Sequence, residues 1–421
     1  MLPGDQKDTT EIRGGSNFLG WRECHHLKRS TPGDKEQRGS KGENVTHRER
    51  ILAALNHQEP DRVPLDLGSH NSSTLTAGAH ERLGAFCGVP AEPRPRVGSR
   101  WLSTVVPDEA ILRRFAVDAR PLFLGPPDTQ PERVLPDGSL LNEWGITFAK
   151  HGESHYFPAN GPFVHLNEPN LKDLEAHLWP DPADPGRYRG LRDRAKSLHE
   201  GTDYAVVLNP GAGPVHLGQW LRGFEGWLTD LLVNPVFSQG LMDRITDIWV
   251  ETIGRALKEA GDYVDIVCWG DDLATQRGPQ MHPNLYRQLI KPRQKRMVEA
   301  VKRHGKPILF HSCGSVVSLL PDLIDLGIDA LNPVQVSAVG METNVLKREF
   351  GRDITFWGAI DTQAVLPRGT PADVRAEVKR RIHDLAPGGG YVLSAVHNIQ
   401  PDVPPENIVA MFEAALEYGK Y

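Results

Sequence analysis

The stretch Pro307-Ile308-Leu309-Phe310-His311-Ser312-Cys313-Gly314 is an apolar run that ends in polar residues and a glycine. The run predicts a short buried strand, followed by the loop at its carboxyl end. Residues two apart in an extended segment point to the same side, so we expect the His311 imidazole and the Cys313 thiol to face one space. The pair indicates a zinc or thiol site, and the alternative is a buried thiol beside a hydrogen-bonded histidine.

The same pattern, an apolar or β-branched run followed by a polar residue or glycine, recurs along the chain and alternates with helical segments. This alternation predicts a parallel sheet, and eight strands are the number that a closed (β/α)8 barrel needs. We therefore expect an α/β protein with a single (β/α)8 TIM barrel. The predicted strands are Arg62–Leu67, Phe115–Ala119, Tyr204–Asn209, Tyr263–Trp269, Pro307–Phe310, Ala330–Pro333, Ile354–Gly358 and Tyr391–Ala395.

The chain divides into a polar extension, the barrel and an insertion. Residues 1–44 are charged and glycine-rich and are predicted to be disordered, whereas Thr46 is a capping residue that opens the first helix. The barrel is expected over residues 45–421. A proline-rich stretch at 121–198 follows the second strand and contains a hairpin turn at residues 136–139, so it is predicted to be an insertion that caps the barrel mouth.

The composition excludes several classes of protein. The formal net charge of -6 over 421 residues gives no nucleic-acid-binding signature, and the four cysteines are too scattered for a disulfide scaffold. The sequence contains no apolar run long enough to cross a bilayer and no signal-peptide core. We expect a cytoplasmic protein without a membrane or nucleic-acid partner.

Polar residues follow nearly all of the predicted strands, and in barrels of this type chemistry collects at the carboxyl ends of strands. Such a ring indicates a catalytic pocket for a small molecule. The paired carboxylates are acid/base candidates, although one of them is equally suited to capping a turn, and the amides suit either a polar ligand or the loop backbone. The candidates are Asp66, Asp118, Asn209, Asp271, Asp272, Gln276, His311, Cys313, Asn332, Gln335, Asp361 and His397.

Several motifs together resemble the uroporphyrinogen decarboxylase superfamily. They are Arg48–Leu55 through Asp61–Pro64, Gly270–Leu273, His311–Gly314, and His397–Pro401 with Pro405–Ile408. The resemblance runs from about residue 46 to the end and implies a TIM-barrel enzyme. Two branches are relevant: decarboxylases, which act on a tetrapyrrole without cofactor or metal, and corrinoid-linked methyltransferases, which use zinc.

The decarboxylase branch is matched only in part. Its members carry an arginine-containing segment after the first strand that grips substrate carboxylates, whereas residues 67–74 contain no arginine here. Carboxylate recognition relies on guanidinium groups, so this departure argues against decarboxylation. Two other positions match: Asp118 corresponds to the aspartate that contacts pyrrole nitrogens, and His397 to a histidine near the carboxyl end.

The methyltransferase branch implies a zinc site. His311 and Cys313 match its His-x-Cys pair, and His397 stands where its further cysteine would be. A zinc ion on two imidazoles and one thiolate has a net charge of about +1, which makes it a stronger Lewis acid than a two-cysteine site and favours an oxygen or ether substrate. The resemblance further implies a corrinoid (methylcobalamin) held by another protein, and a homodimer.

Our first interpretation is therefore a zinc-dependent methyltransferase or demethylase that works with a corrinoid partner. The first alternative is a cofactor-free tetrapyrrole decarboxylase with an altered carboxylate grip. The second is a barrel that binds a corrinoid or another small molecule without turnover. The missing arginines argue against decarboxylation, and the ring of polar strand ends argues against mere binding.

Overall fold

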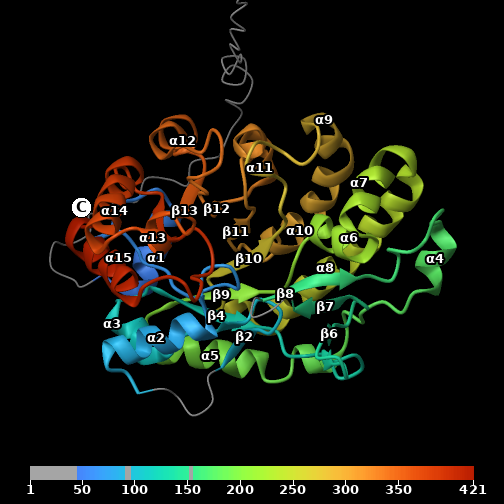
Figure 1. Ribbon diagram of the computed structural model, residues 1–421, viewed down its shortest axis with the longest axis horizontal. Coiled ribbons are helices and arrows are strands. Elements are labelled where there is room, and N and C mark those ends of the chain that lie inside the picture. The colour runs from blue at the N-terminus through green and yellow to red at the C-terminus, as the bar shows by residue number, and fades with distance from the viewer. Residues whose placement is uncertain (1–44, 91–95, 151–154) are drawn as a thin grey trace, which may run out of the picture. The chain divides into compact units, whose positions relative to one another are not determined.

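A sheet of seven parallel strands forms the centre of the protein. The computed structural model describes residues 45–90, 96–150 and 155–421, so the extension predicted at 1–44 lies outside the described residues. The strand order is β14-β13-β12-β11-β10-β9-β4, and the sheet curls as in a TIM barrel (Figure 1). The strands are β4 (Ala119–Phe123), β9 (Ala205–Asn209), β10 (Ile266–Gly270), β11 (Ile308–His311), β12 (Ala330–Asn332), β13 (Thr355–Ile360) and β14 (Tyr391–Ala395).

The predicted first strand, Arg62–Leu67, joins the two ends of this sheet through a few bonds. Leu65 makes a parallel bridge to Leu393 of β14, and Asp66 N donates to Leu393 O at 2.9 Å. On the other side, Asp118 N donates to Leu65 O at 2.8 Å, immediately before β4. The segment thus occupies the closing position of the barrel, although it is too briefly paired to form a regular strand.

The second strand lies later in the sequence than predicted. Residues 115–119 were expected to form it, but α3 (Glu109–Arg114) is capped by Phe115, and Ala116 turns the chain with a φ of 50°. Pairing in parallel with β9 then starts at Ala119 and continues to Phe123. The apolar residues Phe115 and Val117 are buried beneath the turn, so their hydrophobicity reflects core packing.

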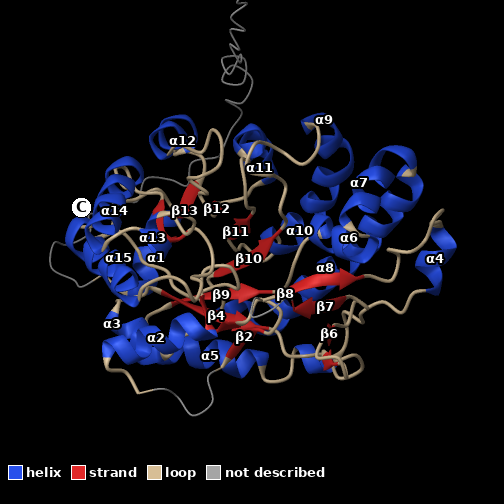
Figure 2. Ribbon diagram, viewed as in Figure 1, coloured by secondary structure: helices blue, strands red, loops and turns tan. Residues whose placement is uncertain are grey.

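Helices flank the strands of the sheet (Figure 2). The predicted cap at Thr46 is confirmed, since its side chain accepts from Glu49 N in a capping box. None of the helices in the described ranges has the length and apolar character that a bilayer crossing requires. Besides α3, the helices in the described residues are α1 (His47–Leu55), α2 (Ala77–Cys87), α4 (Leu171–Ala176), α5 (Leu191–Gly201), α6 (Pro214–Arg222), α7 (Phe224–Val233), α8 (Pro235–Ala260), α9 (Pro283–Leu285), α10 (Lys291–Lys302), α11 (Leu320–Leu326), α12 (Thr343–Phe350), α13 (Val365–Arg368), α14 (Pro371–Leu385) and α15 (Pro405–Tyr418).

The segment between β4 and α5 contains a four-stranded antiparallel sheet. Its first hairpin pairs β5 with β6 around the predicted turn at residues 136–139. Because β4 runs to Phe123 and α5 packs against α8 and β9, the segment outside the barrel is residues 124–190, shorter than the predicted 121–198. Its strands are β5 (Arg133–Val134), β6 (Leu140–Leu141), β7 (Thr147–Lys150) and β8 (Tyr156–Asn160); β1 (Leu75–Thr76), β2 (Val97–Ser99) and β3 (Thr104–Val105) form a separate small sheet.

Candidate active site

A cavity of about 1110 Å³ lies at the carboxyl ends of the barrel strands. Its wall combines strand-end residues with residues of the 124–190 segment, such as Gln130 and Trp144. Four of the predicted site residues contribute to the lining: Asn209, Asp272, His311 and His397. The carboxyl ends of parallel strands meet at one edge, which is why residues far apart in the sequence share this cavity.

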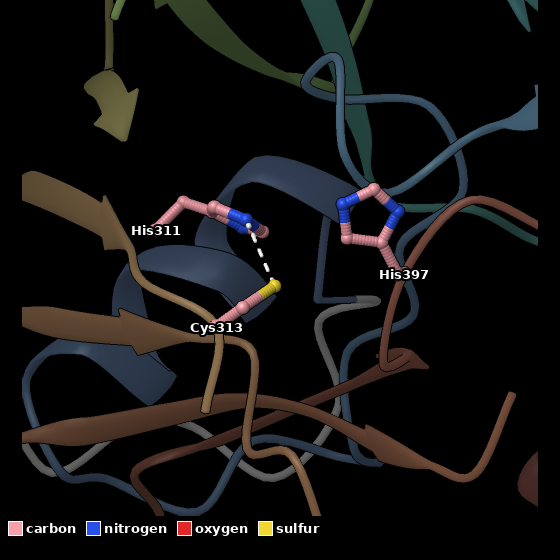
Figure 3. A group of neighbouring side chains, drawn as sticks. All are labelled: His311, Cys313 and His397. Atoms are coloured by element: carbon pink, nitrogen blue, oxygen red, sulfur yellow. Dashed lines mark hydrogen bonds between the residues drawn. The ribbon is translucent and has the colours of Figure 1, made fainter. Parts of the chain in front are cut away.

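The three predicted zinc ligands lie close together. His311 is the last residue of β11, Cys313 lies two residues further on, and His397 lies two residues after β14. One ligand atom from each falls within 4.8 Å of the others, and the Cys313 Sγ is 3.5 Å from the His311 Nε2. Figure 3 shows the two imidazoles on either side of the thiol. This separation suits donors that converge on one metal ion.

Two amides hold this cluster in place from behind. The Oδ1 of Asn332, at the end of β12, accepts from the His311 Nδ1 at 2.6 Å, which leaves the Nε2 lone pair directed toward Cys313. Asn332 Nδ2 donates to Trp357 O at 3.2 Å, so the orientation of the amide is fixed. Gln335 Oε1 accepts from Gly314 N at 2.7 Å. Both predicted amides therefore position the His-Ser-Cys-Gly turn. Neither belongs to the cavity lining in the part of the chain that the structure describes.

Burial keeps the three ligand groups uncharged when no cation is present. It lowers the pKa of His397 to about 4, with a further contribution from His311, and it lowers the pKa of His311 despite the nearby Asp272 carboxylate. Burial also raises the pKa of the Cys313 thiol well above its usual value, and Asp272 adds to this effect. Two neutral imidazoles and a thiol are groups that a metal ion converts into ligands, with release of the thiol proton.

Asp272 links the cluster to a histidine that the sequence analysis did not single out. Asp272 Oδ1 accepts from Cys313 N at 2.8 Å, and Oδ2 lies 3.2 Å from His216 Nε2. Burial lowers the pKa of His216, but the charge and hydrogen bond of Asp272 outweigh it and raise the pKa to about 9. Burial likewise raises the pKa of Asp272, and the charge of His216 reverses the effect, so the net shift is downward. The pair is an imidazolium and a carboxylate at neutral pH.

Asp271 has a different place from the one predicted. It is fully buried and does not belong to the cavity lining among the described residues. Its Oδ1 accepts from Val215 N at 2.8 Å and His216 N at 2.9 Å, and Oδ2 accepts from Gln294 at 3.0 Å. Burial raises its pKa to about 6. Asp271 therefore caps the first turn of α6 and positions His216. Of the two expectations for the paired carboxylates it has the capping role and not the acid/base role, although the turn that it caps belongs to α6 and does not follow it in the chain.

Asp118 lies at the amino end of β4, so the expectation that it ends a strand and contacts substrate is wrong. It is completely buried, and its carboxylate pairs with Arg50 at 2.6 Å, Arg62 at 2.8 Å and His47 at 2.6 Å. Active sites in barrels of this type lie at the carboxyl ends of the strands, so a carboxylate at the amino end is assigned a stabilising role. The error follows directly from the shifted second strand.

Three further candidates also lie outside the cavity lining of the described residues. Asp66 is buried and accepts from Trp357 Nε1 at 2.8 Å and Ser69 N at 3.1 Å, so it supports the loop after the first strand. Gln276 is an exposed turn residue. Asp361 accepts from Gln363 N at 2.6 Å and thereby caps its own turn.

Besides His216, the cavity includes His70, Trp220 and Gln280, which were not predicted. His216 stacks on Trp220 with ring centroids 5.2 Å apart, and His70 lies 6.1 Å from the His311 ring. His70 lies in the loop after the first strand, and Gln280 lies in the loop between β10 and α9, so the strand-end rule applied to whole loops would have found both. His216 lies in the first turn of α6, beyond the loop after β9, so this rule does not reach it.

Comparisons with known proteins give one family and two kinds of enzyme. A family model described as uroporphyrinogen decarboxylase (URO-D) matches residues 153–418. The uroporphyrinogen decarboxylase of Alkalilimnicola ehrlichii is 24% identical over 88% of this chain and 94% of its own. The methylcobamide:CoM methyltransferase MtbA of Methanosarcina mazei is 25% identical over 89% of this chain and 98% of its own length. A solved methyltransferase from Methanosarcina mazei covers 89% of this chain and 99% of its own, with 20% identity and a TM-score of 0.64, which supports the fold.

Proposed function

Because the chain belongs to the uroporphyrinogen decarboxylase family, we propose that it is a zinc-dependent methyltransferase that works with a corrinoid carried by another protein. The family is enzymatic, and the relatives of similar identity include both decarboxylases and MtbA methyltransferases. The observation that carries the proposal is the cluster of His311, Cys313 and His397, whose ligand atoms lie within 4.8 Å of one another. Cofactor-free decarboxylation has no use for such a cluster.

The donor set fits zinc. Three protein ligands of the imidazole and thiolate type, with one position open, are typical of catalytic zinc sites. The second nitrogen of His311 is held by Asn332 at 2.6 Å, as a metal-bound imidazole requires. When bound, zinc would lower the pKa of a coordinated thiol or oxygen and so favour transfer of a methyl group to or from that atom. Asp272 would keep the Cys313 backbone in place through its 2.8 Å hydrogen bond.

The loop after the first strand supports transfer over decarboxylation. In place of arginines it provides Ser69, His70 and Asn71, and Asn209 fixes the loop by donating to Ser69 O at 3.0 Å. Uroporphyrinogen carries many carboxylates. Each of them needs a cation or several hydrogen-bond donors in the site to offset the cost of its desolvation. Neutral side chains at this point of the cavity do not meet that need.

The proposal is tested by assaying methyl transfer and bound zinc in the same samples. We expect protein purified without chelator to contain about one zinc per chain and to demethylate methylcobalamin in the presence of an acceptor. Cys313→Ser should lose zinc and activity together. Cys87→Ser is the matched control, because Cys87 lies in α2 and does not line the cavity in the described part of the chain.

The alternatives give different results in the same experiment. Metal-free protein that decarboxylates uroporphyrinogen would overturn the proposal in favour of the decarboxylase branch. Zinc-free protein that binds a corrinoid without turnover would favour the binding barrel. Zinc that survives Cys313→Ser unchanged would place the metal elsewhere and would also contradict the proposal.

A further inference from the structure

The charged side chains of the cavity wall are paired with one another. Arg187 Nη1 donates to Glu143 at 3.1 Å, Arg100 lies 3.6 Å from Glu132, and His216 lies 3.2 Å from Asp272. In the described lining these are all the arginine, lysine, aspartate and glutamate side chains, so away from the proposed zinc ion no unpaired cation is left for a ligand anion. A ligand charge that does not reach the metal would lose its hydration without gaining a partner of opposite charge, so this part of the cavity favours a neutral ligand.

Aromatic rings make up much of the rest of the wall. The lining tryptophans and phenylalanines are Trp101, Trp144, Trp220, Trp249, Trp269, Phe123 and Phe224. Several contact one another: the ring centroids of Trp101 and Trp220 are 5.2 Å apart, and those of Trp144 and Trp249 are 5.7 Å apart. A wall of this kind binds planar rings by burial and by offset or edge-to-face contacts.

Some polar atoms of the same wall have no hydrogen-bond partner. They are donors and acceptors of residues that line the cavity, namely His70 Nε2, Asn71 Oδ1, Gln130 Oε1, Trp249 Nε1 and Trp269 Nε1. His70 and both tryptophans are at least nine-tenths buried, so water does not reach these atoms freely. Buried polar groups are normally satisfied, and a group of orphans around one cavity indicates a ligand that supplies the missing bonds. Hydroxyl and ether oxygens on a ring would do so.

We propose that the cavity binds a neutral methoxylated aromatic compound and that this compound is the methyl donor. The inference rests on the proposed methyltransferase function and adds its substrate class. In the reaction the bond between the methyl carbon and the aryl oxygen breaks, and its electron pair stays on the oxygen, which leaves as a phenol after taking a proton from water. The methyl group goes to a reduced Co(I) corrinoid of the partner protein, whose electron pair forms the new bond.

Isothermal titration calorimetry with two matched probes tests the substrate class on the full chain. The probes are 2-methoxyphenol, which is neutral, and 2-methoxybenzoate, which has the same ring and methoxy group with a carboxylate. We expect saturable binding of the phenol and at least tenfold weaker binding of the benzoate. Trp220→Ala should lower the affinity for 2-methoxyphenol roughly tenfold, because a ring contact is lost. Phe86→Ala, an exposed aromatic of α2, is the control and should change nothing.

A gain-of-function variant keeps the test independent of folding. Gln130→Arg places an unpaired cation in the wall, and we expect it to strengthen 2-methoxybenzoate binding at least tenfold relative to the phenol. Equal or tighter binding of the benzoate by the unmodified chain, or no binding of the phenol, would overturn the inference. Neither result contradicts the proposed function, because zinc content and methylcobalamin demethylation test that function separately. Conversely, phenol binding by protein that holds no zinc would support the inferred ligand class and contradict the proposed methyltransferase function.

Discussion

Asn332 determines which nitrogen of His311 faces Cys313 and the proposed metal position. Its Oδ1 accepts from the His311 Nδ1, and its Nδ2 is held by Trp357 O. A neutral imidazole has one donor nitrogen and one acceptor nitrogen, so fixing the donor fixes the acceptor on Nε2. In the proposed zinc site this side chain would act through His311, which makes it a positioning residue.

Removing this acceptor should weaken zinc binding without unfolding the protein. We expect Asn332→Ala to lower zinc affinity roughly 10–100-fold, because the His311 ring loses its orientation. Competition with a chromophoric chelator measures the affinity. Asn332→Asp keeps an acceptor for Nδ1 and should stay close to the original affinity; if it fell as far as Asn332→Ala, the hydrogen bond to His311 would not be the cause.

The sequence predicted the ligand trio but only part of the rest of the site. His311 and Cys313 were predictable as a pair because two residues at a strand end share a face. His397 joined them as a third ligand because it stands where the resembled methyltransferases carry a further cysteine. The roles of Asp271 and Asn332 were not predictable, because the sequence pattern is the same whether a carboxylate or amide beside a cavity points into it or forms hydrogen bonds with the backbone. Only the hydrogen-bond partners of each side chain decide this.

At the level of elements, α6 depends on a carboxylate from another strand. Asp271, just after β10, accepts from the Val215 and His216 backbone nitrogens in the first turn of α6. The chain can approach this closely because residue 213 is glycine: a Cβ there would lie 2.5 Å from the Asp271 Cγ. The contact fixes the helix and, through it, the His216 side chain at the cavity.

Truncating this cap should destabilise the protein. Asp271→Ala leaves two buried backbone donors without an acceptor, and we expect the free energy of unfolding to fall by about 2 kcal/mol. Chemical denaturation measures it. Asp361→Ala removes a carboxylate that caps its own, more accessible turn and should cost clearly less. Equal losses for both variants would show that Asp271 is not specially placed.

For the molecule as a whole, barrel closure depends on Asp118. Its buried carboxylate joins Arg50 and His47 of α1 to Arg62 of the closing segment, and its Oδ2 accepts from Leu65 N at 2.7 Å. Burial raises the pKa of Asp118, but the hydrogen bond from His47 and the charges of Arg62 and Arg50 outweigh it and lower the pKa overall. Removing one member of such a network leaves buried cations uncompensated.

Asp118→Asn should therefore lower the free energy of unfolding by roughly 3–5 kcal/mol. A lowered native pKa means that the carboxylate stabilises the fold above about pH 4, its unfolded value, and that this stability is lost as the pH falls through the native pKa. The acid-induced loss should be smaller in the variant. Thermal and acid unfolding measure both effects, with the exposed ion-pair variant Glu251→Gln as a control that should leave them unchanged.

The barrel was predictable because alternating strands and helices leave a strong pattern, and all of the parallel strands observed here overlap or adjoin predicted ones. The closure of the barrel and the position of its second strand were less predictable. Residues 62–67 pair through single bridges, and the apolar residues at 115 and 117 pack in the core without being strand residues. Burial and strand pairing leave the same apolar signal in a short segment, which is why the boundary moved and Asp118 with it.

X-ray absorption at the zinc edge, on protein loaded with one equivalent of zinc, shows whether His311, Cys313 and His397 hold the ion. We expect one sulfur at about 2.3 Å and two imidazole nitrogens at about 2.0 Å, with the sulfur lost in Cys313→Ser. A zinc shell without sulfur, or protein that fails to retain zinc at all, would contradict this expectation.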